Sequence, residues 1–171
     1  AIFVVRGFHL HHWALHQRKW RYVFRVNNNM IDSIKKTTDV RDLSNAQLVE
    51  LASEVRKFLI SSVSKTGGHI GANLGVIELT IALHHCFDLD YDKVLFDVGH
   101  QGYTHKLLTG RKKLFSTLNE IGGMSRFLTS HESDYDLLDA SHAGTSISIA
   151  VGLAFANKEK PHKDRVVAVI G

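Results

Sequence analysis

Two short apolar runs constrain the fold of this chain more than any other feature. The runs VLFDV (94–98) and VVAVI (166–170) are continuous rather than alternating in apolar character. A strand with one face in water alternates apolar and polar residues, whereas a strand buried on both faces does not. We therefore expect both runs to be buried strands of a parallel sheet.

Helical patterns surround these two runs. Ser44 and Gln47 have the spacing of a capping box, and apolar residues then recur every three or four positions. Helices are predicted at residues 44–63, 76–87, 105–108 and 145–157. Residues 111–140 have no regular pattern. Helices between parallel strands are typical of an α/β fold with a doubly wound, mostly parallel sheet and helices on both faces.

Composition limits the class of protein. The chain has 171 residues, 44% hydrophobic and 22% charged, which suits one ordinary globular domain and not a disordered segment. Cys86 is the single cysteine, which excludes an internal disulfide and indicates a reducing compartment. Because Cys86 lies in an apolar stretch, we expect it to be a small core residue.

The basic charge is concentrated in residues 1–29. This head has five Lys and Arg and no acidic residue, whereas the rest has 16 basic and 17 acidic residues. The net charge of +4 is therefore +5 from the head and −1 from the body, and it does not indicate nucleic-acid binding.

The head has no apolar run long enough for a membrane span and no signal-peptide cleavage pattern. Its lack of acids is typical of a transit peptide, but it also lacks Ser and Thr. Three interpretations stay open: a tag-like or wrongly translated extension preceding a natural start at Met30, a targeting segment, or a metal site formed by His12 and His16 on one helix face. We expect residues 1–29 to lie outside the fold, which would begin at residue 30.

A polar cluster follows the first apolar run. In open α/β sheets, ligands bind beyond the carboxyl ends of the strands, so His100 is a candidate ligand contact. Gly99 and Gly102 are expected to clear space for that ligand. Gln101, Tyr103 and His105 either fix the loop or contact the ligand, and we favour the first role for Tyr103 and His105. His84 and His85 lie within a predicted helix and are expected to be structural.

Two further stretches combine glycine with histidine. TGGHIGANLG (66–75) places four glycines around His69 before a helix, an arrangement that can present backbone N–H groups to an anion. DASHAGTSIS (139–148) places Ser141 and His142 just before a helix. Neither nucleotide-binding glycine signature occurs, nor does G-x-S-x-G or a Cys/His zinc spacing.

Taken in order, these stretches carry a specific resemblance. SKTGGHIGANLGVIELTIALH, FDVGHQGYTHKLLTGR, ESDYDLLDASHAGTSIS and VVAVIG closely resemble the 1-deoxy-D-xylulose-5-phosphate synthases. This family belongs to the thiamine-diphosphate-dependent transketolase superfamily. The resemblance runs from about Leu43 to Gly171, and DVGHQ-x-Y-x-HK-x-LTGR is its most specific part.

The resemblance implies a transferase of the transketolase type. The family joins pyruvate to glyceraldehyde 3-phosphate with loss of CO₂, using thiamine diphosphate and Mg²⁺, in isoprene and thiamine biosynthesis. It implies that His69 is catalytic and that His100 binds thiamine diphosphate. Ser141, His142 and Ala143 align with a Gly-His-Ser cofactor-binding triplet, of which only His142 is kept. The alternatives are another transketolase-like thiamine-dependent enzyme, or an interaction module without catalysis.

The resemblance also bears on the rest of the assembly. In the superfamily, VIG continues into a Gly-Asp-Gly motif whose aspartate binds Mg²⁺, and Gly171 is the first glycine of that motif. We therefore expect no metal ligand within the chain, and we expect residues 30–171 to be the N-terminal part of a thiamine-diphosphate-binding domain that is inactive alone. The family implies a homodimer with no nucleic-acid or membrane partner. It implies a cytoplasmic location, or a plastid one if the head is a targeting segment.

Overall fold

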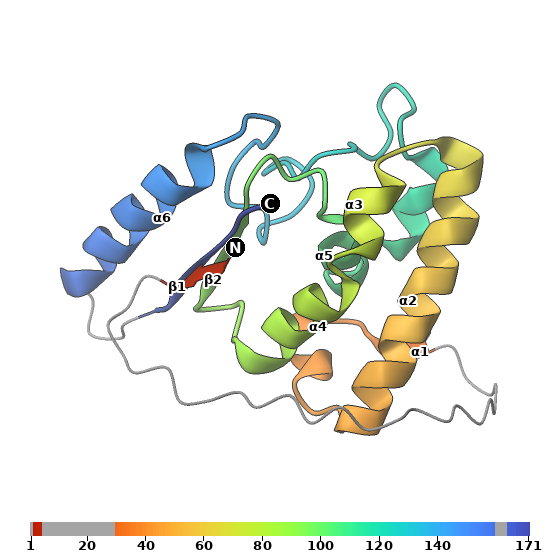
Figure 1. Cartoon of the computed structure of the whole chain (residues 1–171), viewed down its shortest axis with the longest axis horizontal. Coiled ribbons are helices and arrows are strands. Elements are labelled where there is room, and N and C mark those ends of the chain that lie inside the picture. The colour runs from red at the N-terminus through yellow and green to blue at the C-terminus, as the bar shows by residue number, and fades with distance from the viewer. Residues whose placement is uncertain (1, 5–29, 160–163) are drawn as a thin grey trace.

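The computed structural model describes residues 2–4, 30–159 and 164–171 (Figure 1). Its helices are α1 (Met30–Ser33), α2 (Asn45–Thr66), α3 (Ile70–Leu74), α4 (Ile77–Cys86), α5 (Tyr103–Leu108) and α6 (Thr145–Ala156). Its 3₁₀ helices are η1 (Thr37–Val40), η2 (Lys112–Thr117) and η3 (Asn157–Glu159). Its strands are β1 (Ile2–Val4), β2 (Lys93–Phe96) and β3 (Val166–Val169).

The described strands form a small mixed sheet in the order β1-β3-β2. β2 and β3 pair in parallel, from Lys93 with Val166 to Phe96 with Val169, as the two apolar runs predicted. β2 ends two residues earlier than expected, because Val98 adopts a positive φ of 62° that turns the chain out of the sheet.

β1 pairs with β3 in antiparallel register. These three residues of the head add an edge strand to the sheet, and the expected start of the domain at residue 30 stays a prediction. Residues 5–29 lie outside the described residues, as does any targeting role for them. An antiparallel edge on a parallel pair is common in α/β folds.

Helices cover both faces of the parallel pair (Figure 1). On one face, Ala150 of α6 packs in a cluster with Leu95, Val166 and Ala168. On the other face, Leu83 of α4 lies in a cluster with Val94, Phe96, Leu89, Leu128, Val167 and Val169. Alternate residues of each strand therefore point to different cores, which explains why the strand sequences are continuously apolar.

α2 begins and ends with local signals in the sequence. Ser44 Oγ accepts a hydrogen bond from the backbone N–H of Gln47 (3.4 Å), and Gln47 Oε1 accepts one from the backbone N–H of Ser44 (2.9 Å), so the predicted capping box is present. The helix ends at Gly67, whose φ of 75° suits glycine. Its buried residues pack in the main core with α4 and α5.

The segment predicted as one helix over 76–87 needs two corrections. An additional short helix, α3, precedes α4. Cys86 is exposed, so the expectation of a core residue is wrong. The apolar residues of this helix are spread around its axis rather than gathered on one side, so the sequence pattern does not show which side faces the core.

The two helical histidines have structural partners, as expected. His84 is buried, with its Nε2 3.0 Å from Nδ1 of His105. Nδ1 of His85 lies 3.0 Å from the carbonyl oxygen of Val40. Within the described part of the chain, no helix combines the length and the apolar character that a membrane span requires.

Candidate functional site

The fold brings His69 and His100 together from segments that are distant in the sequence. His69 is the N-cap of α3, directly after the Gly67–Gly68 turn, and His100 lies in the loop after β2. Their ring centroids are 5.5 Å apart at an interplanar angle of 75°. Phe127 packs beside His69 at 5.4 Å. Both histidines are half-buried, so solvent or a ligand can reach them.

The two imidazoles have unsatisfied buried atoms. Among the described residues, neither Nδ1 of His69 nor Nδ1 of His100 has a hydrogen-bond partner, and neither does Oε1 of Gln101. Nε2 of Gln101 does donate to the carbonyl oxygen of Asp97 (3.0 Å). Buried polar atoms without partners are rare in folded proteins and often mark a site for a ligand or water. These three atoms can form hydrogen bonds to a polar ligand that lies between the two segments.

His69 is tuned toward its neutral form. Burial lowers its pKa below the usual value, and the charges of His100 and Arg126 lower the pKa further. A neutral imidazole has one nitrogen that accepts a proton. His69 is therefore suited to act as a general base near neutral pH.

Asn73 links the two histidine segments, and the sequence interpretation missed it. Its side chain is fully buried, and Nδ2 donates to the carbonyl oxygens of His69 (2.7 Å) and His100 (2.8 Å). Its Oδ1 accepts from the backbone N–H of Tyr103 (2.8 Å). An asparagine four residues after His69, between the apolar Ile70 and Leu74, is the sequence signal that could have revealed it.

Tyr103 fixes the loop, as expected from the sequence. It is fully buried, and its hydroxyl accepts a hydrogen bond from the backbone N–H of His69 (3.3 Å). Burial raises the pKa of this phenol. Gly68 permits the approach, because a Cβ at that position would lie 2.7 Å from the Tyr103 hydroxyl oxygen.

Gly99 and Gly102 have a different role from the expected one. A Cβ at Gly99 would lie 2.5 Å from Cβ of Ala140, and one at Gly102 would lie 2.6 Å from Cδ2 of Leu128. The absence of a side chain at these two glycines therefore lets the 128–140 segment pack against them. The expectation that they clear space for a ligand is wrong, because residues of the 128–140 segment fill that space.

Asp97 fixes the start of α6 at the same edge of the sheet. Its carboxylate accepts hydrogen bonds from the backbone N–H of Gly144 (2.9 and 3.0 Å) and of Ser146 (3.2 Å), and from Oγ of Ser146 (2.9 Å). Burial opposes ionisation, but these hydrogen bonds together lower the pKa of Asp97. Because Asp97 is three residues before His100, this tether places residues 141–143 at the edge that carries His100.

The triplet Ser141, His142 and Ala143 is exposed. The triplet lies on the surface at the edge of the site, whereas the rings of His69 and His100 contact each other. Ser141 has a φ of 131°, a conformation that glycine adopts without strain. The serine that stands where the family pattern has glycine therefore imposes local backbone strain.

The remaining polar residues after β2 form a buried ion network. Arg111 donates to both carboxylate oxygens of Asp136 (2.6 and 2.8 Å). Lys106 donates to the carbonyl oxygen of Ser125 (2.8 Å) and to Glu132 (2.5 Å). The network binds the irregular 125–136 segment to α5. His105 also belongs to it, because its Nε2 lies 3.3 Å from Asp136, which confirms the structural role expected for this histidine.

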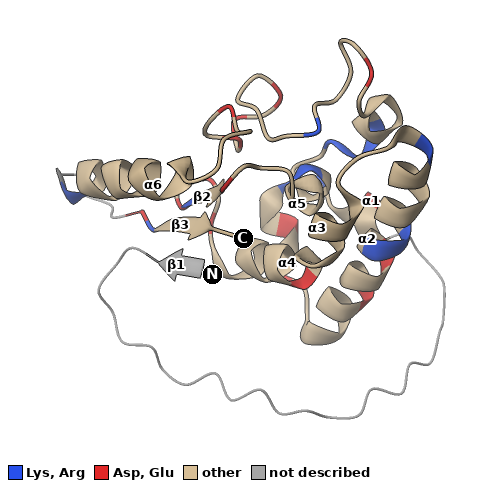
Figure 2. Cartoon of the chain, turned by 45° about the horizontal axis from the view of Figure 1, so that its top comes forward, with Lys and Arg blue, Asp and Glu red and all other residues tan. Residues whose placement is uncertain are grey.

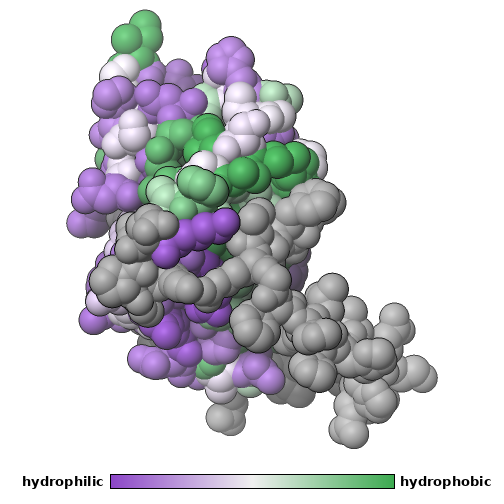
Figure 3. All heavy atoms as spheres, turned by 90° about the vertical axis from the view of Figure 1, so that its left-hand side faces the viewer, coloured by the Kyte–Doolittle hydropathy of each residue, from purple (hydrophilic) through white to green (hydrophobic). Residues whose placement is uncertain are grey.

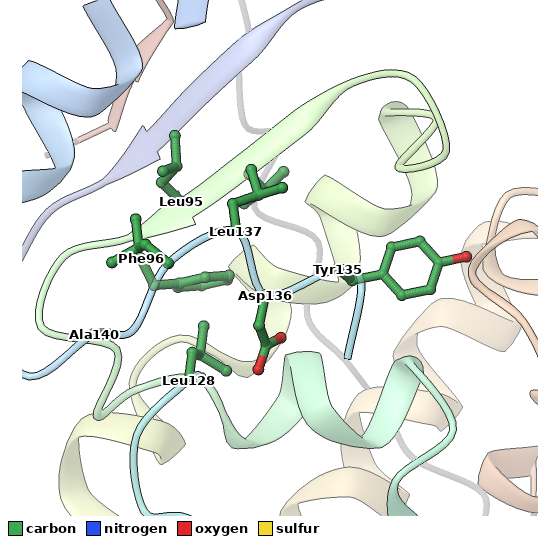
Figure 4. A pocket seen from close by; sticks show the side chains of 9 residues that line it. Leu95, Phe96, Leu128, Tyr135, Asp136, Leu137 and Ala140 are labelled. Carbon is green, nitrogen blue, oxygen red and sulfur yellow. The ribbon is translucent and has the colours of Figure 1, made fainter. Parts of the chain in front are cut away.

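A small pocket lies behind this segment, between β2 and residues 128–140 (Figure 4). Its lining is mostly apolar, including Leu95, Phe96 and Leu137. The one carboxylate in the lining, Asp136, is already bound to Arg111. The other polar side chain in the lining, Tyr135, donates its hydroxyl to Asp90 (2.9 Å), and neither His69 nor His100 lines the pocket. Across residues 2–4, 30–159 and 164–171, no three His, Cys, Asp or Glu side chains cluster as metal ligands.

Comparison with known proteins decides the family. The family model described as 1-deoxy-D-xylulose-5-phosphate synthase matches residues 31–171. The chain belongs to the 1-deoxy-D-xylulose-5-phosphate synthase family. It is 50% identical over 142 residues to the 1-deoxy-D-xylulose-5-phosphate synthase of Leptothrix cholodnii, covering 83% of this chain and 22% of that protein.

Two other synthases give a consistent picture. The chain is 52% identical over 143 residues to the enzyme of Clostridium kluyveri, covering 84% of this chain and 23% of that protein. It is 54% identical over 143 residues to 1-deoxy-D-xylulose-5-phosphate synthase 2 of Kitasatospora griseola, covering 83% and 22% respectively. The chain thus spans less than a quarter of the length of these synthases. Below, "full-length protein" means this chain within a protein of that length.

Proposed function

We propose that the full-length protein is a 1-deoxy-D-xylulose-5-phosphate synthase that joins pyruvate to glyceraldehyde 3-phosphate with loss of CO₂. The observation that carries the proposal is the His69–His100 pair, with an unpartnered buried Nδ1 on each ring. Both histidines lie in the segments that resemble the family most closely. The product is a precursor for isoprene and thiamine biosynthesis. We also propose a cytoplasmic location, which the bacterial relatives named above support.

Thiamine diphosphate fits the residues that are present. The unpartnered Nδ1 of His100 and Oε1 of Gln101 lie near the carboxyl end of β2, where α/β folds bind cofactors. Thiamine diphosphate, when bound, supplies the electron sink for decarboxylation and carbon–carbon bond formation. His100 would hold the cofactor, and residues 141–143 would line it from the rim. His69, held neutral, would take or return protons at substrate oxygen atoms.

Mg²⁺ prefers oxygen ligands and bridges carboxylates to phosphates. We propose that the full-length protein binds it with the aspartate of a Gly-Asp-Gly motif that begins at Gly171. The domain would then be the diphosphate-binding domain of a thiamine-dependent enzyme, with a doubly wound sheet larger than the one described above.

Replacing His100 by alanine should raise the dissociation constant of thiamine diphosphate at least tenfold. This is a loss of about 1.4 kcal/mol, which is within the range for a hydrogen bond to a charged group. Calorimetric titration of the full-length protein in the presence of Mg²⁺ would measure it. His131→Ala is the matched control, since this histidine side chain is 86% exposed. Equal affinity in the two variants, with His100→Ala folded, would refute the assignment of His100.

A homodimer is supported by the outer face of α6. The sequence of this helix, TSISIAVGLAFA, has no charged residue (Figure 2). Ile147, Val151 and Phe155 repeat every four residues along it and are 46, 50 and 69% exposed. The view toward this side shows apolar surface gathered there (Figure 3). Contiguous exposed apolar surface of this kind usually marks an interface, and we propose a second copy as the partner.

Val151→Lys should shift the full-length protein from dimer to monomer, because a charge would be buried in the interface without a partner. Sedimentation velocity across a concentration series would show the change. Leu114→Lys introduces the same charge at another exposed apolar residue (44% exposed) and should leave the dimer intact. A Val151→Lys protein that is folded and still dimeric would exclude α6 from the interface.

A further inference from the structure

The side-chain amide of Asn73 makes three hydrogen bonds, all of them to backbone groups of the site. Each N–H of its amide serves a different histidine carbonyl, and its oxygen holds the first residue of α5. The side chain has no exposed surface. The amide is therefore fixed in one orientation, because a flip would place an oxygen against two carbonyl oxygens.

Tyr103 also links the His69 segment to the His100 segment. Its backbone N–H binds Asn73, and its hydroxyl accepts from the backbone N–H of His69. Within the described residues, three hydrogen bonds join segment 67–75 to segment 99–105, and each uses a side chain of Asn73 or Tyr103. His69 precedes a helix of only five residues, and His100 follows the end of β2, so little regular structure fixes either backbone.

We propose that Asn73 and Tyr103 are positioning residues that together set the separation and mutual orientation of the His69 and His100 rings. The inference rests on the proposed function, in which these histidines form the site. Asn73 and Tyr103 have no exposed surface, so they would act on the site only through the backbone groups that they hold. A displacement of about 1 Å in a catalytic group can cost on the order of 10²-fold in rate, so the link matters for turnover.

Asn73→Asp tests this role with almost no change in shape. Aspartate retains the oxygen that accepts from the Tyr103 N–H, but as a carboxylate it cannot donate to the carbonyls of His69 and His100. In the unliganded protein, the imidazole NMR signals of both histidines should shift. In Tyr103→Phe, which adds no charge, the pKa of His69 should rise toward its ordinary value as the ring leaves its buried place beside His100. In the full-length protein, kcat/KM should fall on the order of 10²-fold.

Asn157→Asp is the matched control. Asn157 is also a buried asparagine, and its Nδ2 donates to the carbonyl oxygen of Asp164 (3.3 Å) at the far end of α6. This variant should leave the NMR signals of both site histidines and kcat/KM unchanged. If Asn73→Asp does not fold, as judged by circular dichroism, Tyr103→Phe carries the test, because it removes only the acceptor for the His69 N–H.

The NMR measurement separates this inference from the proposed function. Unchanged histidine signals and an unchanged His69 pKa in a folded Asn73→Asp protein, or in Tyr103→Phe if the first is unfolded, would overturn the positioning role. Histidine signals that shift in the uncharged Tyr103→Phe protein as well uphold it, even if the wild-type full-length protein has no thiamine-dependent activity. That last result would refute the proposed function alone.

Discussion

Replacing His69 by alanine in the full-length protein should lower kcat/KM by about 10²-fold or more, the usual scale for losing a positioned acid–base group. The structure supports this expectation in two ways. The imidazole lies between Phe127 and His100 with a free Nδ1, and its lowered pKa keeps it able to accept a proton. Steady-state kinetics with pyruvate and glyceraldehyde 3-phosphate would measure the loss.

The pH profile gives a second measurement of the same variant. Because burial and then the charges of His100 and Arg126 lower the pKa of His69, the wild-type kcat/KM should fall only below about pH 6.5, the ordinary histidine value. This fall of kcat/KM at acidic pH should be missing in His69→Ala. The variant should fold normally, since the His69 side chain makes no capping hydrogen bond to α3. Near-normal turnover would remove His69 from the catalytic residues.

The sequence predicted the parts of the fold that follow from apolar pattern and capping chemistry. The two buried strands, their parallel pairing and the start of α2 at Ser44 are all present. These features depend on residues close together in the sequence, or on burial of both strand faces. The predicted burial of Cys86 was wrong because the apolar residues of α4 are spread around the helix and do not mark its buried face.

The site was predictable only in part, because its order depends on contacts between distant segments. The resemblance named His69 and His100, but no local pattern shows that Asn73 reaches the carbonyls of both. The glycines after β2 were misread for the same reason. A glycine signals a close approach, yet the sequence does not say whether a ligand or Leu128 makes that approach.

The polar cluster after β2 also shows how one stretch can divide its roles. His100 faces the proposed site, whereas His105 and Lys106 turn inward to the ion network. Charged side chains are seldom fully buried unless they are paired. Part of this polar cluster therefore has a structural role: His105 and Lys106 bind the irregular 125–136 segment, which carries Phe127 beside His69.

Asp136→Ala should lower the free energy of unfolding by about 3–5 kcal/mol, the usual cost of removing one partner from a buried ion pair. The substitution would remove the two carboxylate oxygens that accept the shortest hydrogen bonds of the buried Arg111 guanidinium. It would also remove the acceptor for the backbone N–H of Thr129 (3.1 Å). Chemical denaturation would measure the loss, and Asp134→Ala, an exposed carboxylate two residues away, should cost little.

Acidification should reduce the contribution of Asp136 to the free energy of unfolding. Burial opposes its ionisation, but hydrogen bonds and charge from His105 and Arg111 hold the pKa of this carboxyl well below its ordinary value. A depressed folded-state pKa gives stability that is complete above the unfolded-state value of about 3.9 and is lost as the pH falls below it. The difference in unfolding free energy between wild type and Asp136→Asn should therefore be constant near neutral pH and shrink below about pH 4. A difference that stays constant down to pH 2 would show that Asp136 is not held as a carboxylate by its neighbours.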